Sequence, residues 1–380
     1  MKNNPPHIML LAGEASGDQH GAEMALELLK SNPELKLTGM GSQEMKGAGV
    51  SVFFDSASIA VMGIVEIAKH WGDIKIAMKL VKQQLEETKP DLLVCIDYPE
   101  FNLKMANHAK SLGIKVLFYI SPQVWAWRPK RVKKIGRRID HMAVIFPFEV
   151  DFYQQHGIPV TYVGHPLVDT VPKALPLLDA QAEVNIPNKK ITIGLFPGSR
   201  QSELERLLPT LLDSAELLAK QYQNEIQFVL PVAKTLDVKK IEESIKSSGV
   251  TVLLKEGHVH SVINSCDAII SCSGTVTLEI ALLGVPLCVV YKMSWLSHQI
   301  MSRLMIIDHF SLVNIVAKQE IVKEMLQDQA TPENIVKEVS RLINDKAYAQ
   351  QVKKGLHDVK QRLGSGGGSK KVSQLALSLL

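Results

Sequence analysis

Short apolar runs alternate along the chain with segments in which apolar residues recur at helical spacing. In the first half, Gly21–Lys30 and Ala106–Leu112 have the helical pattern. The apolar runs around them are short enough for buried strands and lie at His7–Ala12, Leu35–Gly39, Asp91–Asp97, Ile114–Ile120, His141–Phe146 and Tyr162–Val163. Because strands that alternate with helices pair in parallel, this half predicts a parallel α/β sheet.

The second half repeats the pattern, with a predicted helix at Leu204–Lys220 and strands at Ile191–Phe196, Ile226–Leu230, Thr251–Leu254, Ala268–Ser271 and Val285–Tyr291. Asp169–Lys190, between the halves, holds three prolines and little periodicity. We therefore predict an α/β fold of two Rossmann-like domains facing a central cleft, with ligands at the carboxyl ends of the strands. The expected domains are residues 1–168 and 169–354, and a helix at 355–380 is expected to pack back on the first domain.

Composition places the chain among folded soluble proteins. It has 380 residues, of which 46% are apolar and 22% charged, so it can bury two domain cores and disorder is excluded as its main state. Four cysteines without a CxxC pair predict reduced, buried thiols in a cytosolic protein. The N-terminal apolar run is too short for a signal peptide, and no stretch reaches the ~18 apolar residues of a membrane-spanning helix. The GSGGGS sequence at Gly364–Ser369 predicts a flexible turn.

The small positive charge of the chain has a single source. The formal net charge is +4, and Arg128–Arg138 holds seven basic residues and no acid. Without that segment, 36 basic residues would face 39 acidic ones. This distribution argues against a nucleic-acid binder, which spreads its cations over a long footprint, and favours a local site for phosphate or an anionic surface.

Two tryptophans, Trp125 and Trp127, open the basic segment. Trp beside Lys and Arg suits a membrane interface, although a solvated basic helix with core tryptophans would give the same sequence. Ile59–Leu80 adds an apolar patch at helical spacing, which an ordinary amphipathic core helix explains equally well. The patch consists of Ile64, Val65, Ile67, Ala68 and Trp71. Because both features fall in the first half, we predict that the first domain faces lipid.

Two turns of the second half carry residues suited to phosphate. In PGSR, Gly198 allows close backbone approach and Arg200 offers a bidentate fork, although a tight turn with a surface Arg would read the same. The segment SGTVTLE, at Ser273–Glu279, puts small residues at a strand-to-helix junction, where backbone N–H groups and the helix dipole favour an anion. A capped helix is the alternative there.

Together, the two turns predict a nucleotide-diphosphate site. Gly274 and Thr275 are expected to cradle the diphosphate, and Glu279 to accept hydrogen bonds from ribose hydroxyls. Neither GxxxxGK[ST] nor GxGxxG occurs, so a P-loop or a standard dinucleotide fingerprint is not indicated.

The first half offers carboxylates at two strand ends. GEASGD, at Gly13–Asp18, places Glu14, Ser16 and Asp18 after the first strand, although an N-cap from Ser16 or Asp18 would explain that turn. Asp97 ends the strand DLLVCID, where it is either a general base facing a cleft or the cap of the next helix.

No residue pattern indicates a metal or another cofactor. Histidines occur singly near turns, at His20, His165 and His258, and neither HExxH nor a DxD pair is present. A lone histidine is more often structural than catalytic.

The order of the motifs resembles that of the lipid-A-disaccharide synthase family from Gly13 to about Glu324. The matching segments are AGEASGD, GMG(x)₃MKGAG, VMGIVEI, CIDYPEFN, SPQVWAWRPKRVKKIG, FPFE, VGHPL, LFPGSR, SGTVTLE and NIVAKQEIVKE. The resemblance implies an inverting, metal-independent GT-B glycosyltransferase without a cofactor. Such an enzyme transfers 2,3-diacylglucosamine from UDP-2,3-diacylglucosamine to the 6-hydroxyl of 2,3-diacylglucosamine 1-phosphate (lipid X), giving lipid A disaccharide 1-phosphate and UDP.

The resemblance also implies a place for the chain in the cell. The protein would be cytoplasmic and peripheral on the inner face of the Gram-negative cytoplasmic membrane, with no nucleic-acid partner. A homodimer stays open, because the glycine-rich tail and the last helix could cross between subunits.

Residue roles follow from the same resemblance. It assigns catalysis to Asp97 and Glu14, without deciding which is the base. The expected UDP-binding residues are Gly198, Ser199, Arg200, Gly257, Ser273, Gly274, Thr275 and Glu279. The expected donor or acceptor contacts are Ser16, Asn314, Trp127, Arg128 and Arg131.

The sequence departs from the family at three places. Val313 replaces a usual Pro, Lys318-Gln319 replaces Gly-Arg, and Glu100 stands where Asp is common. The first two put the shape of the donor loop in question more than the reaction. Rival readings are another GT-B enzyme that uses UDP-N-acetylglucosamine on a different lipid, a UDP-sugar epimerase, or a non-catalytic lipid- or nucleotide-binding protein.

Overall fold

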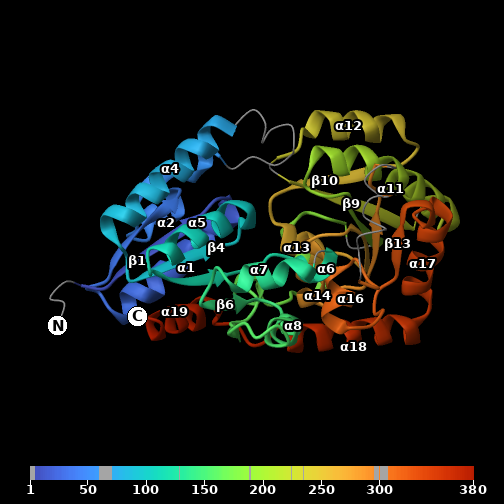
Figure 1. Ribbon diagram of the computed structural model, residues 1–380. Helices are drawn as coiled ribbons and strands as arrows, with labels where there is room; N and C mark the ends of the chain where they lie inside the picture. Colours follow the sequence, from blue (N-terminus) through green and yellow to red (C-terminus); the bar gives the residue numbers. More distant parts are fainter. Residues whose placement is uncertain are drawn as a thin grey trace. The chain divides into compact units, whose positions relative to one another are not determined.

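The computed structural model describes residues 5–59, 71–127, 129–187, 190–223, 225–233, 235–294, 299 and 307–380. The chain divides into two compact units (Figure 1). The first comprises Met1–Asp169 and Ser365–Leu380, and the second comprises Thr170–Gly364. The chain therefore passes from one unit to the other twice.

The first unit is built on a seven-stranded sheet in which all neighbouring strands run parallel, in the order β3-β2-β1-β4-β5-β6-β7. Its strands are β1 His7–Ala12, β2 Lys36–Gly41, β3 Ser51–Asp55, β4 Leu92–Ile96, β5 Lys115–Tyr119, β6 His141–Val144 and β7 Val160–Tyr162. Its helices are α1 Ala15–Ser31, α2 Gln43–Gly47, η1 Ser56–Ser58, α4 Trp71–Thr88, α5 Pro99–Ser111, α6 Val124–Trp127, η2 Pro129–Arg131, α7 Val132–Gly136, α8 Phe148–Gln154, α9 Leu167–Thr170 and α19 Gly368–Ser378.

Each face of this sheet has its own apolar core, because successive strand residues point to opposite sides. Met9 and Leu11 of β1 pack in the core that α4, α5 and α7 cover. Ile8 and Leu10 pack in the core that α1, α2 and α19 cover. This burial on both faces explains why the strands read as continuous apolar runs rather than as alternating ones.

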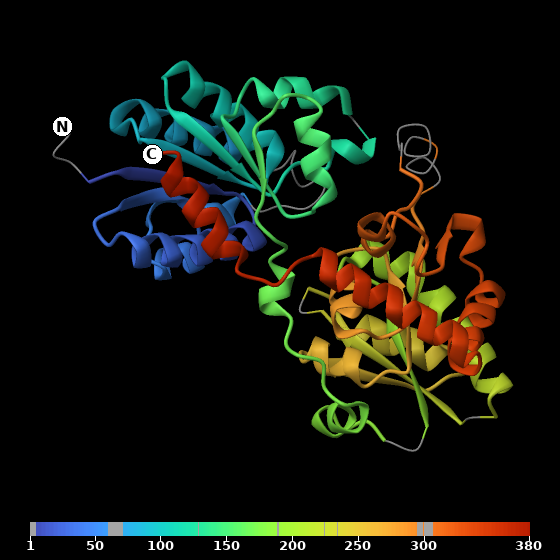
Figure 2. The same ribbon diagram turned by 90° about the horizontal axis from the view of Figure 1, so that it is seen from below.

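The last helix, α19, belongs to the first unit and lies beside α1 (Figure 2). Val372 and Ala376 are fully buried, and Ser373 Oγ donates to the Met24 carbonyl at 3.0 Å. The preceding α18, Lys346–Arg362, instead packs on helices of the second unit. The part of the tail that returns to the first unit is thus residues 365–380, shorter than the predicted 355–380.

The glycine-rich segment before α19 is a defined turn rather than the predicted flexible one. Gly364, Gly366 and Gly367 have φ values of 88°, 87° and 75°, which favour glycine. The Asp169 carboxylate accepts hydrogen bonds from the backbone N–H groups of Gly367 at 2.7 Å and Gly368 at 3.1 Å. Asp169 therefore fixes the start of α19.

The second unit has a six-stranded parallel sheet in the order β10-β9-β8-β11-β12-β13. Its strands are β8 Ile191–Phe196, β9 Ile226–Val232, β10 Val252–Glu256, β11 Ala268–Cys272, β12 Leu287–Tyr291 and β13 Glu324–Leu326. Its other helices are α10 Leu177–Glu183, α11 Gln201–Gln221, α12 Val238–Ser247, α13 Val259–Asn264, α14 Val276–Leu283, α16 Leu312–Ala317, η3 Gln327–Gln329 and α17 Pro332–Asn344.

Several elements that the sequence pattern missed are short or lie at edges, but the longer helices α12 and α17 were also not predicted. β3 and β13 are edge strands, so their side chains are only partly buried and the apolar pattern is weak. Helix α10 lies within the proline-containing segment where no periodicity is visible. The predicted apolar patch at Ile64, Val65, Ile67 and Ala68 and the side chain of Trp71 lie outside the described residues. Among the described helices, none is long and apolar enough to cross a membrane.

Both sheets reverse their strand order next to the first strand of the unit. In the first unit β1 lies between β2 and β4, and in the second unit β8 lies between β9 and β11. In doubly wound sheets, ligands bind outside the carboxyl ends of the two strands at such a switch point. The loops expected to meet ligands are therefore those after β1 and β4, and those after β8 and β11.

Candidate active site

A cavity of about 500 Å³ lies at the switch point of the second unit. The turns after β8 and β11 line it together with the ends of β9 and β10. Among its lining residues are all eight that the sequence proposes for UDP: Gly198, Ser199, Arg200, Gly257, Ser273, Gly274, Thr275 and Glu279. The fold thus brings residues up to 81 positions apart in the chain, Gly198 and Glu279, around one pocket of a size that suits a small ligand.

The PGSR turn is held by a residue that the sequence analysis missed. Glu203, in the first turn of α11, accepts hydrogen bonds from the backbone N–H groups of Ser199 at 3.1 Å and Arg200 at 3.3 Å. Its other oxygen lies 3.4 Å from Nη1 of Arg200. The Arg200 side chain remains 61% exposed, so Glu203 orients the guanidinium without removing it from the pocket.

Gly198 is required in this turn for two reasons. Its φ is 111°, and a Cβ atom there would lie 2.3 Å from Oε2 of Glu203. We expect Gly198→Ala to weaken UDP binding measurably, because alanine strains the backbone and displaces the carboxylate that holds the turn. Isothermal titration with UDP measures this effect.

Gly284→Ala is the matched control for that experiment. Gly284 ends α14 with φ 77°, and a Cβ atom there would meet nothing within 4 Å. Both variants should lose stability from backbone strain, whereas UDP affinity should fall only in Gly198→Ala. Equal UDP affinity in the two variants would show that the turn after β8 does not hold the nucleotide.

The turn after β11 opens helix α14 towards the same pocket. Gly274 has open space where a side chain would be, and Thr275 is the N-cap residue of the helix. Ser273 Oγ donates to the Phe310 carbonyl at 3.0 Å, and Thr277 Oγ1 donates to the Gly274 carbonyl at 2.7 Å. These bonds fix the turn, and Gly274, Thr275 and Val276 at the start of α14 line the cavity, where the N-terminus of a helix favours an anion.

Glu279 has a partner that the sequence did not reveal. Its Oε2 lies 2.9 Å from Nε2 of His260, at the start of α13. His258, which in the sequence looks like an isolated turn histidine, lines the pocket with a left-handed backbone at φ 48°. His258 therefore borders the predicted nucleotide site directly, and His260 contacts it through Glu279.

The structure does not support the predicted donor contact of Asn314. Its side chain is fully buried, and its Oδ1 accepts from the N–H groups of Ile321 at 2.8 Å and Val322 at 3.0 Å. Its Nδ2 donates to the Val322 carbonyl and to Glu324 Oε1, both at 2.8 Å. Because all its hydrogen-bonding capacity is used internally, Asn314 holds the loop between α16 and β13 and is not a substrate ligand.

In the first unit, Asp97 directly follows β4 in a strained backbone. Asp97 and Tyr98 both have φ 47°, which is unusual for residues other than glycine. Burial raises the pKa of the Asp97 carboxyl, against the lowering effects of the Tyr98 backbone N–H and of His20. The N-cap residue of α5 is Tyr98, without a side-chain cap bond, so capping does not account for the carboxylate.

A buried asparagine, which the sequence analysis overlooked, supports this strained turn. Nδ2 of Asn102 donates to the carbonyls of Asp97 at 2.7 Å, Ile96 at 3.2 Å and Leu11 at 3.3 Å. The Asp97 N–H in turn donates to the Tyr119 carbonyl at 2.9 Å. The ends of β1, β4 and β5 are thereby tied together around Asp97.

The loops after β1 and β4 touch. The Tyr98 ring lies against Gly13, where an added Cβ would be only 2.1 Å from Cδ1. Glu14 is the N-cap residue of α1 without a side-chain cap bond, and its charge helps to raise the pKa of Tyr98, after burial. Ser16 is exposed in the first turn of the same helix.

Asp18 does not belong to this group. It is 3% exposed and accepts hydrogen bonds from the backbone N–H groups of Ser42 at 2.5 Å and Glu44 at 3.0 Å. It therefore caps α2, not the first helix, and its side chain is turned away from the loop after β1.

The basic segment is only partly a surface feature. Trp125 is 7% exposed and packs edge-on against Phe148 at 4.8 Å, so it is a core residue and not part of a membrane surface. Trp127 is half-buried, and Arg131 forms a 2.8 Å ion pair with Glu100 of α5. Arg128 lies outside the described residues.

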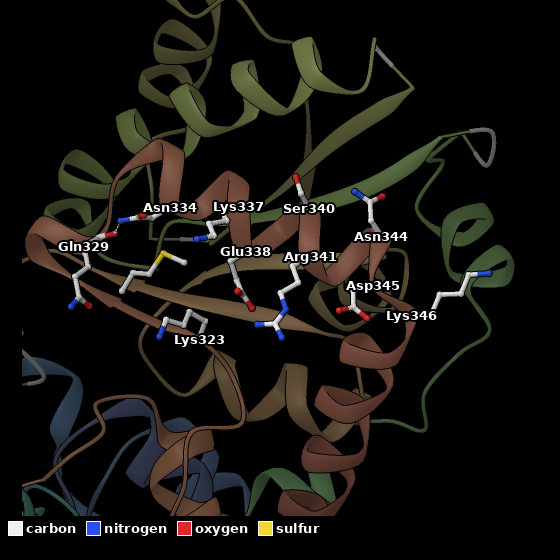
Figure 3. Close-up of a pocket in the computed structure, with 11 residues that line it drawn as sticks. Lys323, Gln329, Asn334, Lys337, Glu338, Ser340, Arg341, Asn344, Asp345 and Lys346 are labelled. Carbon is white, nitrogen blue, oxygen red and sulfur yellow. Dashed lines mark hydrogen bonds between the residues drawn. The ribbon is translucent and has the colours of Figure 1, made fainter.

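A larger hollow of about 1250 Å³ lies along β13 and α17 in the second unit (Figure 3). None of the predicted site residues lines it. Its acidic groups serve the fold, because Glu338 accepts from Tyr348 Oη at 2.6 Å and Asp345 from the Tyr348 N–H at 3.0 Å. Arg341 lies 3.6 Å over the same tyrosine ring. Size alone would favour this hollow, whereas the chemistry favours the pocket at the switch point.

Within the described part of the chain, no group of three or more His, Cys, Asp or Glu side chains could hold a metal ion.

The similarity of this chain to known proteins extends over its whole length. Residues 8–377 match the family model described as lipid-A-disaccharide synthetase. The lipid-A-disaccharide synthase of Geobacter sulfurreducens is 46% identical over 381 residues, which cover 100% of this chain and 99% of the relative. That of Nitrosococcus oceani is 44% identical over 100% of this chain and 98% of the relative.

Solved structures share the architecture at much lower identity. The UDP-GlcNAc 2-epimerase of Neisseria meningitidis, bound to UDP-GlcNAc, has a TM-score of 0.64 at 16% identity, covering 98% of this chain and 100% of that one. MurG of Acinetobacter baumannii has a TM-score of 0.57 at 17% identity, with the same coverage. With these neighbours, the two parallel sheets confirm the predicted two-part GT-B fold.

Proposed function

Because the chain belongs to the lipid-A-disaccharide synthase family, and is thus a glycosyltransferase of lipid A biosynthesis, we propose how its two switch points share the reaction. The second unit binds the UDP of UDP-2,3-diacylglucosamine, and the first unit binds lipid X. The observation that carries this proposal is the single pocket at the switch point of the second unit, which all eight expected UDP residues line.

On the donor side, the pocket supplies charge where the leaving group develops it. The guanidinium of Arg200 and the N–H groups at the start of α14 would contact the diphosphate, and stabilise the negative charge that UDP gains as the glycosidic bond breaks. Glu279, oriented by His260, would accept hydrogen bonds from the ribose. This arrangement needs no metal ion to bind the diphosphate.

On the acceptor side, Asp97 is the proposed general base. It would take the proton from the 6-hydroxyl of lipid X as the oxygen attacks the anomeric carbon, inverting the configuration in one displacement. Burial raises the pKa of the Asp97 carboxyl, and this brings the pKa closer to the working pH, as suits a general base. Glu14 and Ser16, after β1, would orient the acceptor beside it.

The basic segment would bind the anionic part of the lipid. Arg131, together with Trp127 and Arg128, would recognise the phosphate of lipid X or the headgroups of the inner face of the cytoplasmic membrane, where the protein would act as a peripheral enzyme. A homodimer remains a proposal.

The function is tested by incubating purified protein with UDP-2,3-diacylglucosamine and lipid X in the presence of EDTA. We expect disaccharide 1-phosphate and UDP in equal amounts. Absence of product with and without EDTA would reject the function, whereas product lost only with EDTA would reject the metal-independent mechanism.

Charge reversal within residues 129–138 is expected to weaken binding to anionic vesicles more than binding to UDP. The segment holds six of the seven cations of Arg128–Arg138, and coulombic attraction of several basic residues to a lipid surface adds up. Vesicle co-sedimentation and UDP titration of the same variant measure the two affinities. When three of these six cations are reversed, reversal of three lysines in α12, Lys239, Lys240 and Lys246, controls for net charge. Equal loss of affinity for vesicles and for UDP would contradict a role of this segment in binding the lipid surface.

A further inference from the structure

Glu149, at the start of α8, is a buried carboxylate that the proposed mechanism does not use. It is 1% exposed, and within the described residues it forms no salt bridge. Burying an ionisable group without a countercharge costs free energy unless hydrogen bonds replace the lost water. The surroundings of Glu149 therefore need an explanation.

Three donors from three separate segments converge on this carboxylate. Ser121 Oγ donates to Oε1, and Trp125 Nε1 donates to the same oxygen at 3.1 Å. The Phe146 N–H donates to Oε2 at 3.0 Å. Glu149 thus joins the turn after β5, helix α6 and the turn after β6 at one point.

Two of these three segments connect Glu149 to the residues that the reaction needs. Ser121 is two residues beyond Tyr119, whose carbonyl holds the Asp97 N–H. Trp125 is in the same helical turn as Trp127, and the segment continues to Arg131, which pairs with Glu100. The segment that contains Ser121, Trp125 and Arg131 is therefore held at one end by Glu149 and at the other by helix α5, which begins two residues after Asp97.

An aromatic cluster keeps this carboxylate dry. Phe148 packs on Trp125 at 4.8 Å and stacks on Phe146 at 5.4 Å, and Phe146 contacts His165 at 5.0 Å. A hydrogen bond is stronger in such a low-dielectric setting than in water. The cluster thus turns three ordinary donors into a rigid joint.

We propose that Glu149 is a positioning residue, which sets residues 121–131 for binding of the phosphorylated acceptor next to Asp97. The expected effect on kcat/KM rests on the proposed function, whereas the expected effect on hydrogen exchange does not. Glu149 acts through Ser121 and Trp125 and does not itself touch substrate.

Glu149→Gln is the sharpest variant, because it keeps the size of the side chain. Its amide oxygen can still accept from Ser121 and Trp125, whereas its NH₂ group would meet the Phe146 N–H donor and break that bond. Trp125→Phe removes one donor and keeps the ring packing. Ile158→Val, a buried residue of the same unit without a polar contact, controls for a small loss of stability.

Two measurements decide the matter. By hydrogen exchange, residues 121–131 should lose protection in Glu149→Gln and Trp125→Phe, but not in Ile158→Val. By kinetics, kcat/KM for lipid X should fall about 10- to 100-fold in Glu149→Gln, as expected when a binding segment is misplaced, with UDP affinity unchanged. Unchanged exchange in residues 121–131 would overturn the proposal, as would kcat/KM equal to that of Ile158→Val. If the wild-type chain makes no disaccharide, the proposed function fails, while the exchange measurement still tests the joint.

A pH series tests whether Glu149 itself titrates in the folded protein. Burial raises the pKa of Glu149 to about 7, against the lowering effects of Ser121, Phe146 and Trp125. The titratable groups facing it from the described residues are Tyr153 on its own helix and, beyond Phe146, His165, whose pKa is lowered to about 4 by burial. Folding favours the protonated carboxyl, so its contribution to stability is present at acidic pH and decreases as the pH rises towards 7. Chemical denaturation at several pH values should show this decrease in the wild type and not in Glu149→Gln. A decrease that persists in Glu149→Gln would contradict the assignment of the titration to Glu149.

Discussion

Replacing Asp97 with asparagine is expected to lower disaccharide formation by about 10²–10⁴-fold, the usual effect of removing a general base. An amide cannot take the proton from the acceptor hydroxyl. Asparagine also tolerates the left-handed backbone of position 97, where φ is 47°, better than alanine does. The fold and the UDP affinity should therefore survive, and steady-state kinetics with UDP titration separate the two effects.

The same experiment decides between the two candidate bases. Glu14→Gln should have a smaller effect, since Glu14 orients the acceptor in the proposed mechanism. Burial raises the pKa of Asp97, so wild-type activity should decrease on acidification at pH values higher than those at which an ordinary carboxyl titrates. The residual activity of Asp97→Asn should not show this decrease. A larger loss in Glu14→Gln than in Asp97→Asn would transfer the role of base to Glu14.

Replacing Arg200 with alanine should reduce turnover by about 10²–10³-fold, the range seen when one donor to a developing negative charge is removed. The affinity for UDP should fall as well, because the guanidinium faces the predicted diphosphate position. Arg200→Lys should recover only part of the loss, since an ammonium cannot make the bidentate contact. Single-turnover kinetics and UDP titration measure the two effects.

Arg206→Ala is the control for loss of charge on the same helix. Arg206 is exposed on α11 and does not line the pocket, so neither turnover nor UDP affinity should change. If Arg206→Ala reduced UDP affinity as much as Arg200→Ala does, general electrostatics rather than a specific contact would hold the nucleotide.

The sequence was most informative where local pattern and topology coincide. The strands His7–Ala12 and Ile191–Phe196 have the predicted bounds, because strands buried on both faces read as unbroken apolar runs. Small residues that directly follow a strand mark the turns after β8 and β11, although a tight turn and a capped helix were equally compatible with the sequence. Parallel strands then bring such turns to one edge of the sheet.

Partners chosen by the tertiary fold could not be predicted. Glu203, His260 and Asn102 hold the proposed site residues, yet nothing in their local sequence shows what they bind. The same limit explains the errors at Asn314 and Trp125. Asparagine in a loop and tryptophan beside lysines both look exposed in sequence, and only the structure shows their side chains buried and hydrogen-bonded.

The return of α19 to the first unit affects how the chain can fold during synthesis. Residues 1–169 leave the ribosome before the second unit, but their sheet stays uncovered where Val372 and Ala376 belong until residues 365–380 emerge. The second unit, encoded entirely between the two parts of the first, is complete before that. Folding therefore finishes at the unit that was begun first, in contrast to the usual N-to-C order of domains. A premature stop codon before Val372 would consequently leave the core of the first unit, which also holds Asp97, incomplete.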